Sequence, residues 1–139
     1  MIILAEVCSR LGKREAAAEL HKVISRYPEG NATAGDGICF GPIARGLGMV
    51  ATVLERWDDA ERHYLYSMDL SERGGLRPSL ADARMNYADM LLRRDAPGHR
   101  EKARPLLQQA LEAAQEMGMA KLAADCERLL GAVEEPPSA

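Results

Sequence analysis

Arg56-Trp-Asp-Asp-Ala-Glu-Arg-His-Tyr-Leu-Tyr-Ser67 is the stretch of this chain that decides its fold, because its pattern occurs three times. The two related segments are Lys13-Arg-Glu-Ala-Ala-Ala-Glu-Leu-His-Lys-Val-Ile24 and His99-Arg-Glu-Lys-Ala-Arg-Pro-Leu-Leu-Gln-Gln-Ala110. The alanines at positions 17, 60 and 103 mark the period, which is 43 residues in both steps. A fixed period of this length is typical of a fold that stacks one structural unit on the next.

Each segment combines one small and one large residue at helical spacing. A large side chain follows the alanine by four positions, and a residue that can pack closely follows three later. These pairs are His21 with Ile24, Tyr64 with Ser67, and Leu107 with Ala110. Residues three and four apart share one face of a helix. We therefore expect the small residues to let neighbouring helices approach, with the large residues filling the space beside them.

Composition also favours helices. The chain has 139 residues, of which 47% are hydrophobic but only 4% aromatic, so alanine and leucine supply most of the apolar content. Both lose little conformational freedom in a helix, and no segment alternates with a period of two. We expect an all-α fold without a sheet. The 18 basic and 21 acidic residues nearly balance, so we expect neither nucleic acid nor a membrane as a partner.

The order of helix signals predicts one helical domain over residues 1–131. The expected parts are three helix pairs at about 1–28, 42–74 and 78–117, a capping helix at 120–131, a glycine-rich linker loop at 29–41, and a disordered tail at 132–139. Pro42 is expected in the first turn of its helix. Ser79, with Asp82 three residues later, resembles a capping box at the start of another helix.

The residues of the second unit carry a resemblance to a known family. Leu47-Gly48, Ala51, Trp57, Ala60, Tyr64 and Ser67 stand at the spacings of the tetratricopeptide repeat (TPR) family. The units of that family are usually shorter than 43 residues, so these resemble its extended variants. The resemblance implies a right-handed α-solenoid of about three TPR-like helix pairs with a C-terminal capping helix.

A narrower resemblance covers residues 77–119. The segments Asn86-Tyr-Ala-Asp-Met-Leu-Leu92, Arg100-Glu-Lys-Ala103 and Leu106-Leu-Gln-Gln-Ala110 are similar to the C-terminal TPR region of bacterial signal-transduction ATPases. These include LuxR-type regulators and fusions of an ATPase with a nucleotide cyclase. The resemblance implies a signalling or transcription-regulatory setting, in which the repeat region senses or transmits.

No residue pattern indicates a catalytic, cofactor or metal site, and we expect no enzyme. Gly46-Leu-Gly-Met-Val-Ala51 fits a dinucleotide-binding pattern, but that pattern needs a strand before the glycines and a helix starting at them. The three histidines lack a second ligand at helical spacing, and His21 and His63 are expected as half-buried packing residues. The three cysteines do not form a disulfide framework. Acids flank Cys126 and should raise the pKa of its thiol.

The first helix of each expected pair should line a concave face. The side chains projected onto that face are Glu6, Arg10, Arg45, Met49, Thr52, Met85, Asp89 and Arg93. Methionines flanked by charges suit adaptable recognition of a peptide or protein segment. The alternative is that these are ordinary solvated helix faces, with the methionines packed against neighbouring helices.

Three functions remain open. The chain is expected to be a protein interaction module, with two alternatives: a conformational transmitter within a signalling ATPase, or a scaffold that homodimerises through Ile2-Ile-Leu4. The first helix has room for only about three turns before Gly12, which predicts that the chain is the C-terminal piece of a longer array. The lack of a basic lead and a long apolar run at the N-terminus predicts a cytoplasmic location. The sequence does not identify the partner or a small effector.

Overall fold

The computed structural model describes residues 2–27, 29–34 and 38–135, and helices make up most of them. The elements are α1 (Ile2–Leu11), α2 (Arg14–Ile24), β1 (Asn31–Ala34), β2 (Ile38–Pro42), α3 (Ile43–Val53), α4 (Trp57–Arg73), α5 (Arg77–Arg94), α6 (His99–Glu116) and α7 (Ala120–Glu134). The predicted all-α class is confirmed at this level, with one short hairpin added. Among the described residues, none of the helices combines the length and the apolar content that crossing a membrane requires.

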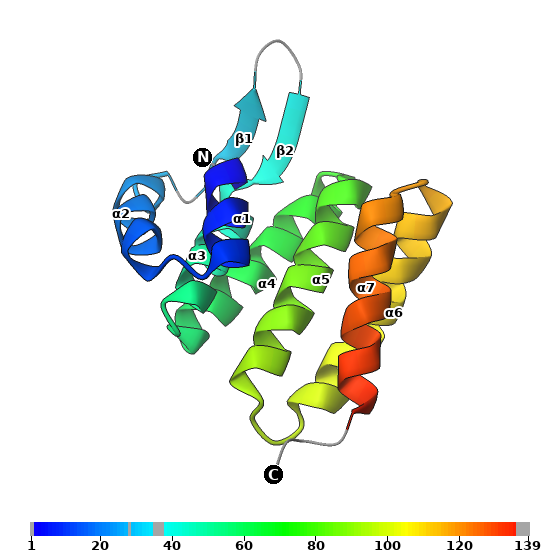
Figure 1. The fold of residues 1–139 in the computed structure, drawn as a ribbon. Coiled ribbons are helices and arrows are strands. Elements are labelled where there is room, and N and C mark those ends of the chain that lie inside the picture. The colour runs from blue at the N-terminus through cyan, green and yellow to red at the C-terminus, as the bar shows by residue number, and fades with distance from the viewer. Residues whose placement is uncertain (1, 28, 35–37, 136–139) are drawn as a thin grey trace.

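The helices pack both on their chain neighbours and in a second row. Each helix contacts the next one along the chain, while α1 also contacts α3, α3 contacts α5, and α5 contacts α7. Figure 1 shows α5 in the middle of the molecule, between α4 on one side and the α6–α7 pair on the other. The odd-numbered helices therefore form one continuous row across the protein.

The repeated alanines and their partners are the points of closest packing. Ala17, Ala60 and Ala103 are each fully buried. Gly48 of α3 shows how tight these contacts are: a β-carbon placed there would lie 2.7 Å from the nearest ring atom of Tyr64 in α4. The ring of Tyr64 in turn packs at an angle against that of Tyr87 in α5, with 6.1 Å between centroids. The repeat pattern thus marks the helix contacts, as predicted.

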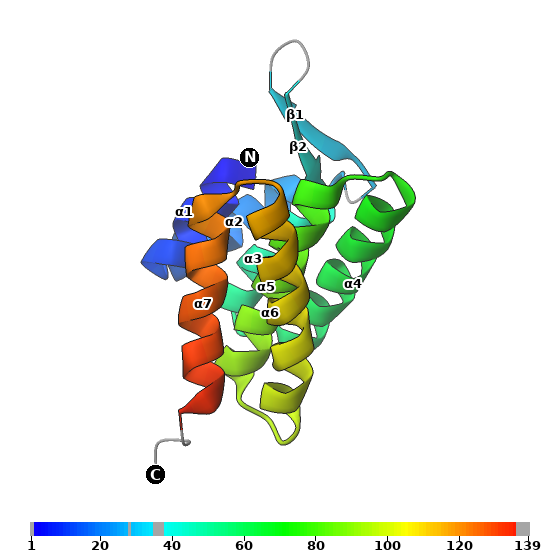
Figure 2. The ribbon, with the colours of Figure 1, turned by 90° about the vertical axis from the view of Figure 1, so that its right-hand side faces the viewer.

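The segment that we expected to be an irregular linker contains a two-stranded antiparallel hairpin. In this hairpin Asn31 of β1 lies opposite Pro42 of β2, and Ala34 lies opposite Ile38. The register of the pairing shifts between Ala32 and Thr33. Figure 2 shows the strands projecting from one end of the helical body. Gly41 has a φ of +87°, and a β-carbon there would lie 2.0 Å from the hydroxyl oxygen of Ser79. Glycine at this position lets β2 pass against α5, so it serves a close approach rather than a free loop.

Three expected helix ends differ in the structure. Pro42 is the N-cap of α3 and the last residue of β2, not a residue of the first helical turn. α5 begins at Arg77, two residues before Ser79, so Ser79 is not a capping residue. Its buried hydroxyl bonds that of Ser71 in α4 at 3.2 Å. α7 continues to Glu134, because Leu129 and Val133 extend its buried face beyond the expected end at 131.

Candidate functional site

A charged cavity of about 100 Å³ lies between the odd-numbered helices. Its walls come from α1, α3, α5 and α7, the row of helices described above. Its residues are Glu6, Ser9, Arg10, Arg45, Met49, Asp82, Met85, Asn86, Asp89, Arg93, Asp125 and Arg128. Four of these side chains are acidic and four are basic, so the cavity carries both signs of charge in equal number.

The structure brings seven of the eight sequence-predicted groove residues to this cavity. These are Glu6, Arg10, Arg45, Met49, Met85, Asp89 and Arg93. The eighth, Thr52, is buried and donates a hydrogen bond to the carbonyl of Gly48 at 2.8 Å. It lines a neighbouring cavity of about 310 Å³, which shares Arg93 with the first. The two cavities therefore adjoin at Arg93.

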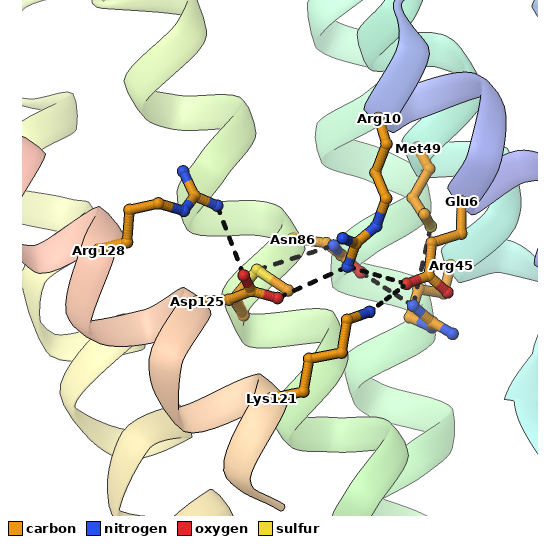
Figure 3. A network of polar contacts seen from close by, with 9 residues as sticks. Glu6, Arg10, Arg45, Met49, Asn86, Lys121, Asp125 and Arg128 are labelled. Carbon is orange, nitrogen blue, oxygen red and sulfur yellow. Dashed lines mark hydrogen bonds and ion pairs between the residues drawn. The ribbon is translucent and has the colours of Figure 1, made fainter.

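A chain of ion pairs crosses the mouth of the charged cavity, from α1 to α7 (Figure 3). Arg10 lies 3.2 Å from Glu6 and 3.6 Å from Asp125, which lies 3.8 Å from Arg128. Lys121 approaches Glu6 at 3.5 Å. Most of these side chains are well exposed, so each pair contributes little to stability. Their consequence is electrostatic: exposed charges of alternating sign form the rim of the cavity.

Arg45 differs from the rim arginines because it is buried, with only 7% of its surface exposed. One terminal nitrogen donates to Asn86 Oδ1 at 3.0 Å and contacts Met49 Sδ at 3.7 Å. Its Nε is buried and has no hydrogen-bond partner among the described residues. Arg45 also forms no ion pair with any carboxylate of the described chain. The contacts that hold this buried guanidinium among the described residues are thus to two neutral side chains, Asn86 and Met49 (Figure 3).

Two carboxylates line the α5 wall of the cavity. Burial raises the pKa of Asp89 above its usual range, although the adjacent Arg93, 3.0 Å away, opposes that shift. Burial likewise raises the pKa of Asp82, and Arg45 partly opposes it. In the part of the chain that the structure describes, Asp82 has neither an ion-pair nor a hydrogen-bond partner. Desolvation therefore disfavours the charged form of Asp82 without a close contact to offset it.

Sequence analysis missed five lining residues. Asp82 lies one helical turn before Met85, so continuing the stripe toward the N-terminus would have found it. The interpretation of Asp82 as part of a capping box concealed this. Asn86 lies three residues before Asp89, within the stripe, and is found from that spacing. Asp125 and Arg128 were not predicted because α7 was interpreted only as a capping helix. Ser9 was not predicted because only its neighbour Arg10 and Glu6 were projected from the first helix onto the concave face.

The methionines do not form an adaptable apolar surface. Met49 is 2% exposed and belongs to the main hydrophobic core, against which Met85 also packs. For these two residues the alternative interpretation, packing against neighbouring helices, matches the structure. The cavity is consequently lined mainly by polar and charged side chains.

Other residues considered for chemistry behave as packing groups. His21 and His63 are half-buried, and burial is the main cause that lowers the pKa of each. Cys126 is buried, and burial together with Asp125 raises the pKa of its thiol to about 11. Gly46 and Gly48 are the fourth and sixth residues of α3, so the helix begins before the glycines and not at them. No cluster of potential metal ligands occurs among the described residues.

Comparison of the chain with protein-family models, with curated proteins and with solved structures gives no match.

Proposed function

We propose that this chain is a non-catalytic interaction module with a TPR-like solenoid arrangement, which binds a peptide or protein segment in the groove formed by its two adjoining cavities. The observation that carries the proposal is the origin of the first cavity. All of its lining residues come from α1, α3, α5 and α7, and none from α2, α4 or α6. In a stack of helix pairs, the first helices share one face, and that face is the ordinary binding surface.

The shape of the groove favours an extended peptide segment over a single small group as its ligand. The two cavities meet at Arg93 and have volumes of about 100 and 310 Å³. The second is lined by Trp57 as well as by Arg14 and Glu55. An extended segment that places an apolar side chain near Trp57 and charged side chains along the rim would use both cavities. Its binding should weaken as salt rises, because the rim charges are exposed.

Selection of peptides from a random displayed library tests this proposal. Selected peptides should bind the natural chain more tightly than an Arg93→Gln/Arg128→Gln variant. Each exposed charge contributes about 0.2–1 kcal/mol, so the pair should weaken binding by about two- to thirtyfold. A matched control, Lys22→Gln/Arg62→Gln, removes two exposed cations of α2 and α4 and should bind as the natural chain does. Equal binding to both variants, or no enriched peptide, would sink the groove proposal.

One observation favours the homodimerising scaffold as a second candidate. Ile3, Leu4, Val7 and Leu11 of α1 are each 45–63% exposed, and Val23 of α2 is 47% exposed. A shallow apolar cavity of about 380 Å³ lies in the same region and includes Leu4 and Val23. Sedimentation equilibrium of the natural chain and a Leu4→Glu/Val23→Glu variant tests this candidate. A natural dimer that the variant converts to a monomer supports it, and a natural monomer at high concentration removes it.

The setting within a bacterial signalling ATPase rests on the resemblance of residues 77–119. It remains a proposal, as do the transmitter role and the cytoplasmic location.

A further inference from the structure

Two unpaired charges of opposite sign face the charged cavity from adjacent helices. Arg45 on α3 is buried with its Nε unbonded, and Asp82 on α5 is half-buried with no hydrogen-bond or ion-pair partner among the described residues. Burying a charge without a partner costs free energy, and two such groups would normally pair with each other. Here they do not form an ion pair, although both line the same small space.

The surroundings explain why Arg45 does not swing toward Asp82. One terminal nitrogen of its guanidinium is bonded to Asn86 Oδ1, and the same nitrogen contacts Met49 Sδ. Met49 is packed in the core, so this wall of the cavity is fixed. The Nε of Arg45 is closed off from solvent, so a ligand in the cavity can reach only the terminal nitrogens, one of which has no protein partner among the described residues. A guanidinium favours a planar acceptor such as a carboxylate.

We propose that the space between Arg45 and Asp82 binds a small zwitterion of the α-amino acid class, its carboxylate accepting hydrogen bonds from Arg45 and its ammonium donating to Asp82. This goes beyond binding of a segment in the groove, since it assigns a separate ligand to the part of the charged cavity lined by α3 and α5. A ligand of this kind pairs both charges at once and adds no net charge to the cavity.

The balance of charge favours a ligand that carries both signs. A lone anion on Arg45 would also face the carboxylates of the cavity, and a lone cation on Asp82 would also face its arginines. The volume is also selective. A cavity of about 100 Å³ holds on the order of three water molecules. This suits the carboxylate and ammonium of a small amino acid.

Nuclear magnetic resonance titration of the natural chain with L-alanine tests the proposal. We expect saturable shifts of backbone amides in α3 and α5 with a Kd of about 1 mM. Alaninamide lacks the carboxylate and N-acetylalanine lacks the ammonium. Each should bind at least about tenfold more weakly, because each loses a hydrogen bond between charged groups.

Two variants assign the partners. In Asp82→Asn the difference between alanine and N-acetylalanine should disappear, because the group that recognises the ammonium is gone. In Arg45→Met the difference in affinity between alanine and alaninamide should disappear, because the group that recognises the carboxylate is gone. Asp82→Asn removes a desolvated charge and should fold at least as well as the natural chain, which a thermal melt checks. Loss of alanine binding in this variant would then not be due to unfolding.

Absence of saturable shifts at about 50 mM alanine, far above a millimolar Kd, would show that water fills the space and would overturn the proposal. Equal binding of the three compounds to the natural chain would overturn it as well. This test can fail independently of the peptide selection, because the selection tests Arg93 and Arg128 whereas the alanine titration tests Arg45 and Asp82. Peptide binding that survives in Asp82→Asn, without alanine binding in the natural chain, would refute this inference alone.

Discussion

Replacing Gly48 with alanine would place one methyl group against the ring of a buried tyrosine. The added carbon would lie 2.7, 2.8 and 2.9 Å from three ring atoms of Tyr64. The ring cannot move away easily, since Tyr64 is 2% exposed and packs against Tyr87. Contacts this short force a shift of the ring or of the α3–α4 pair.

Two opposing effects set the size of the loss. Overpacking of a core costs about 1–3 kcal/mol, and three short contacts to one rigid ring place this site in the upper part of that range. Alanine is preferred over glycine inside a helix by about 0.8–1 kcal/mol, which offsets part of the cost. We therefore expect Gly48→Ala to lower the free energy of unfolding by about 1–2 kcal/mol. For a chain of this size the melting temperature should fall by about 2–8 °C.

Gly131 provides the matched control. It lies in α7, and a β-carbon there would meet no atom within 4 Å. Gly131→Ala should therefore show the helix preference alone and raise stability by about 0.5–1 kcal/mol. Thermal and urea unfolding of the two variants measure both effects. Tyr64→Leu should relieve the clash, so Gly48→Ala should cost less in that background. If Gly48→Ala is as stable as Gly131→Ala, the contact is not a determinant of the α3–α4 packing.

Further predictions concern buried polar groups. Tyr87→Phe removes a 2.5 Å hydrogen bond to Glu61 and should cost about 1–2 kcal/mol in urea unfolding, whereas no change would mean that the bond is offset by solvent. The hydrogen bond from Tyr87, followed by that from Lys102, lowers the pKa of Glu61. That stabilisation is present above the unfolded-state pKa of about 4.5 and is lost as pH falls through the lowered folded-state pKa. The loss on acidification should be smaller in Tyr87→Phe, and equal acid sensitivity would contradict this. Burial raises the pKa of Asp82, so Asp82→Asn should be more stable than the natural chain at pH 7. Its advantage should shrink as pH falls through the raised folded-state pKa and be absent below about 3.8, and a constant advantage would contradict the desolvation of this carboxylate.

The helices could be predicted because their signals are local and repeated. Ala60, Tyr64 and Ser67 are spaced for one helix face, and all three are buried where α4 meets its neighbours. The hairpin could not be predicted in the same way. Its strands are only four and five residues long, and the glycines around it indicate a loop in isolation. The reason for Gly41 is its contact with Ser79, nearly forty residues away in the chain, and a local pattern does not contain that contact.

The groove stripe was predictable for a related reason, and its chemistry was not. Helical spacing projects Glu6, Arg45 and Asp89 onto one face, and the structure places all three at one cavity. Spacing does not report how deep each side chain lies. Met49 was projected onto the concave face, with packing against a neighbouring helix as the alternative, and it is buried; Arg45, four residues before it, is buried with it. Depth depends on α1 and α5 covering α3 on both sides, which is a property of the assembled helices.

Packing of α3 against its neighbouring helices does not explain why an arginine stands at position 45. Every residue of α3 from Ala44 to Val53 is buried. Eight of these ten are apolar or glycine, and Thr52 satisfies its hydroxyl by bonding the carbonyl of Gly48. Arg45 is the exception, with an unbonded nitrogen in the most enclosed helix of the fold. Sequences tend to depart from locally favourable choices at functional positions. A role in stacking would be filled equally well by an apolar side chain of similar length, so the charge of Arg45 supports the proposal of a ligand that uses it.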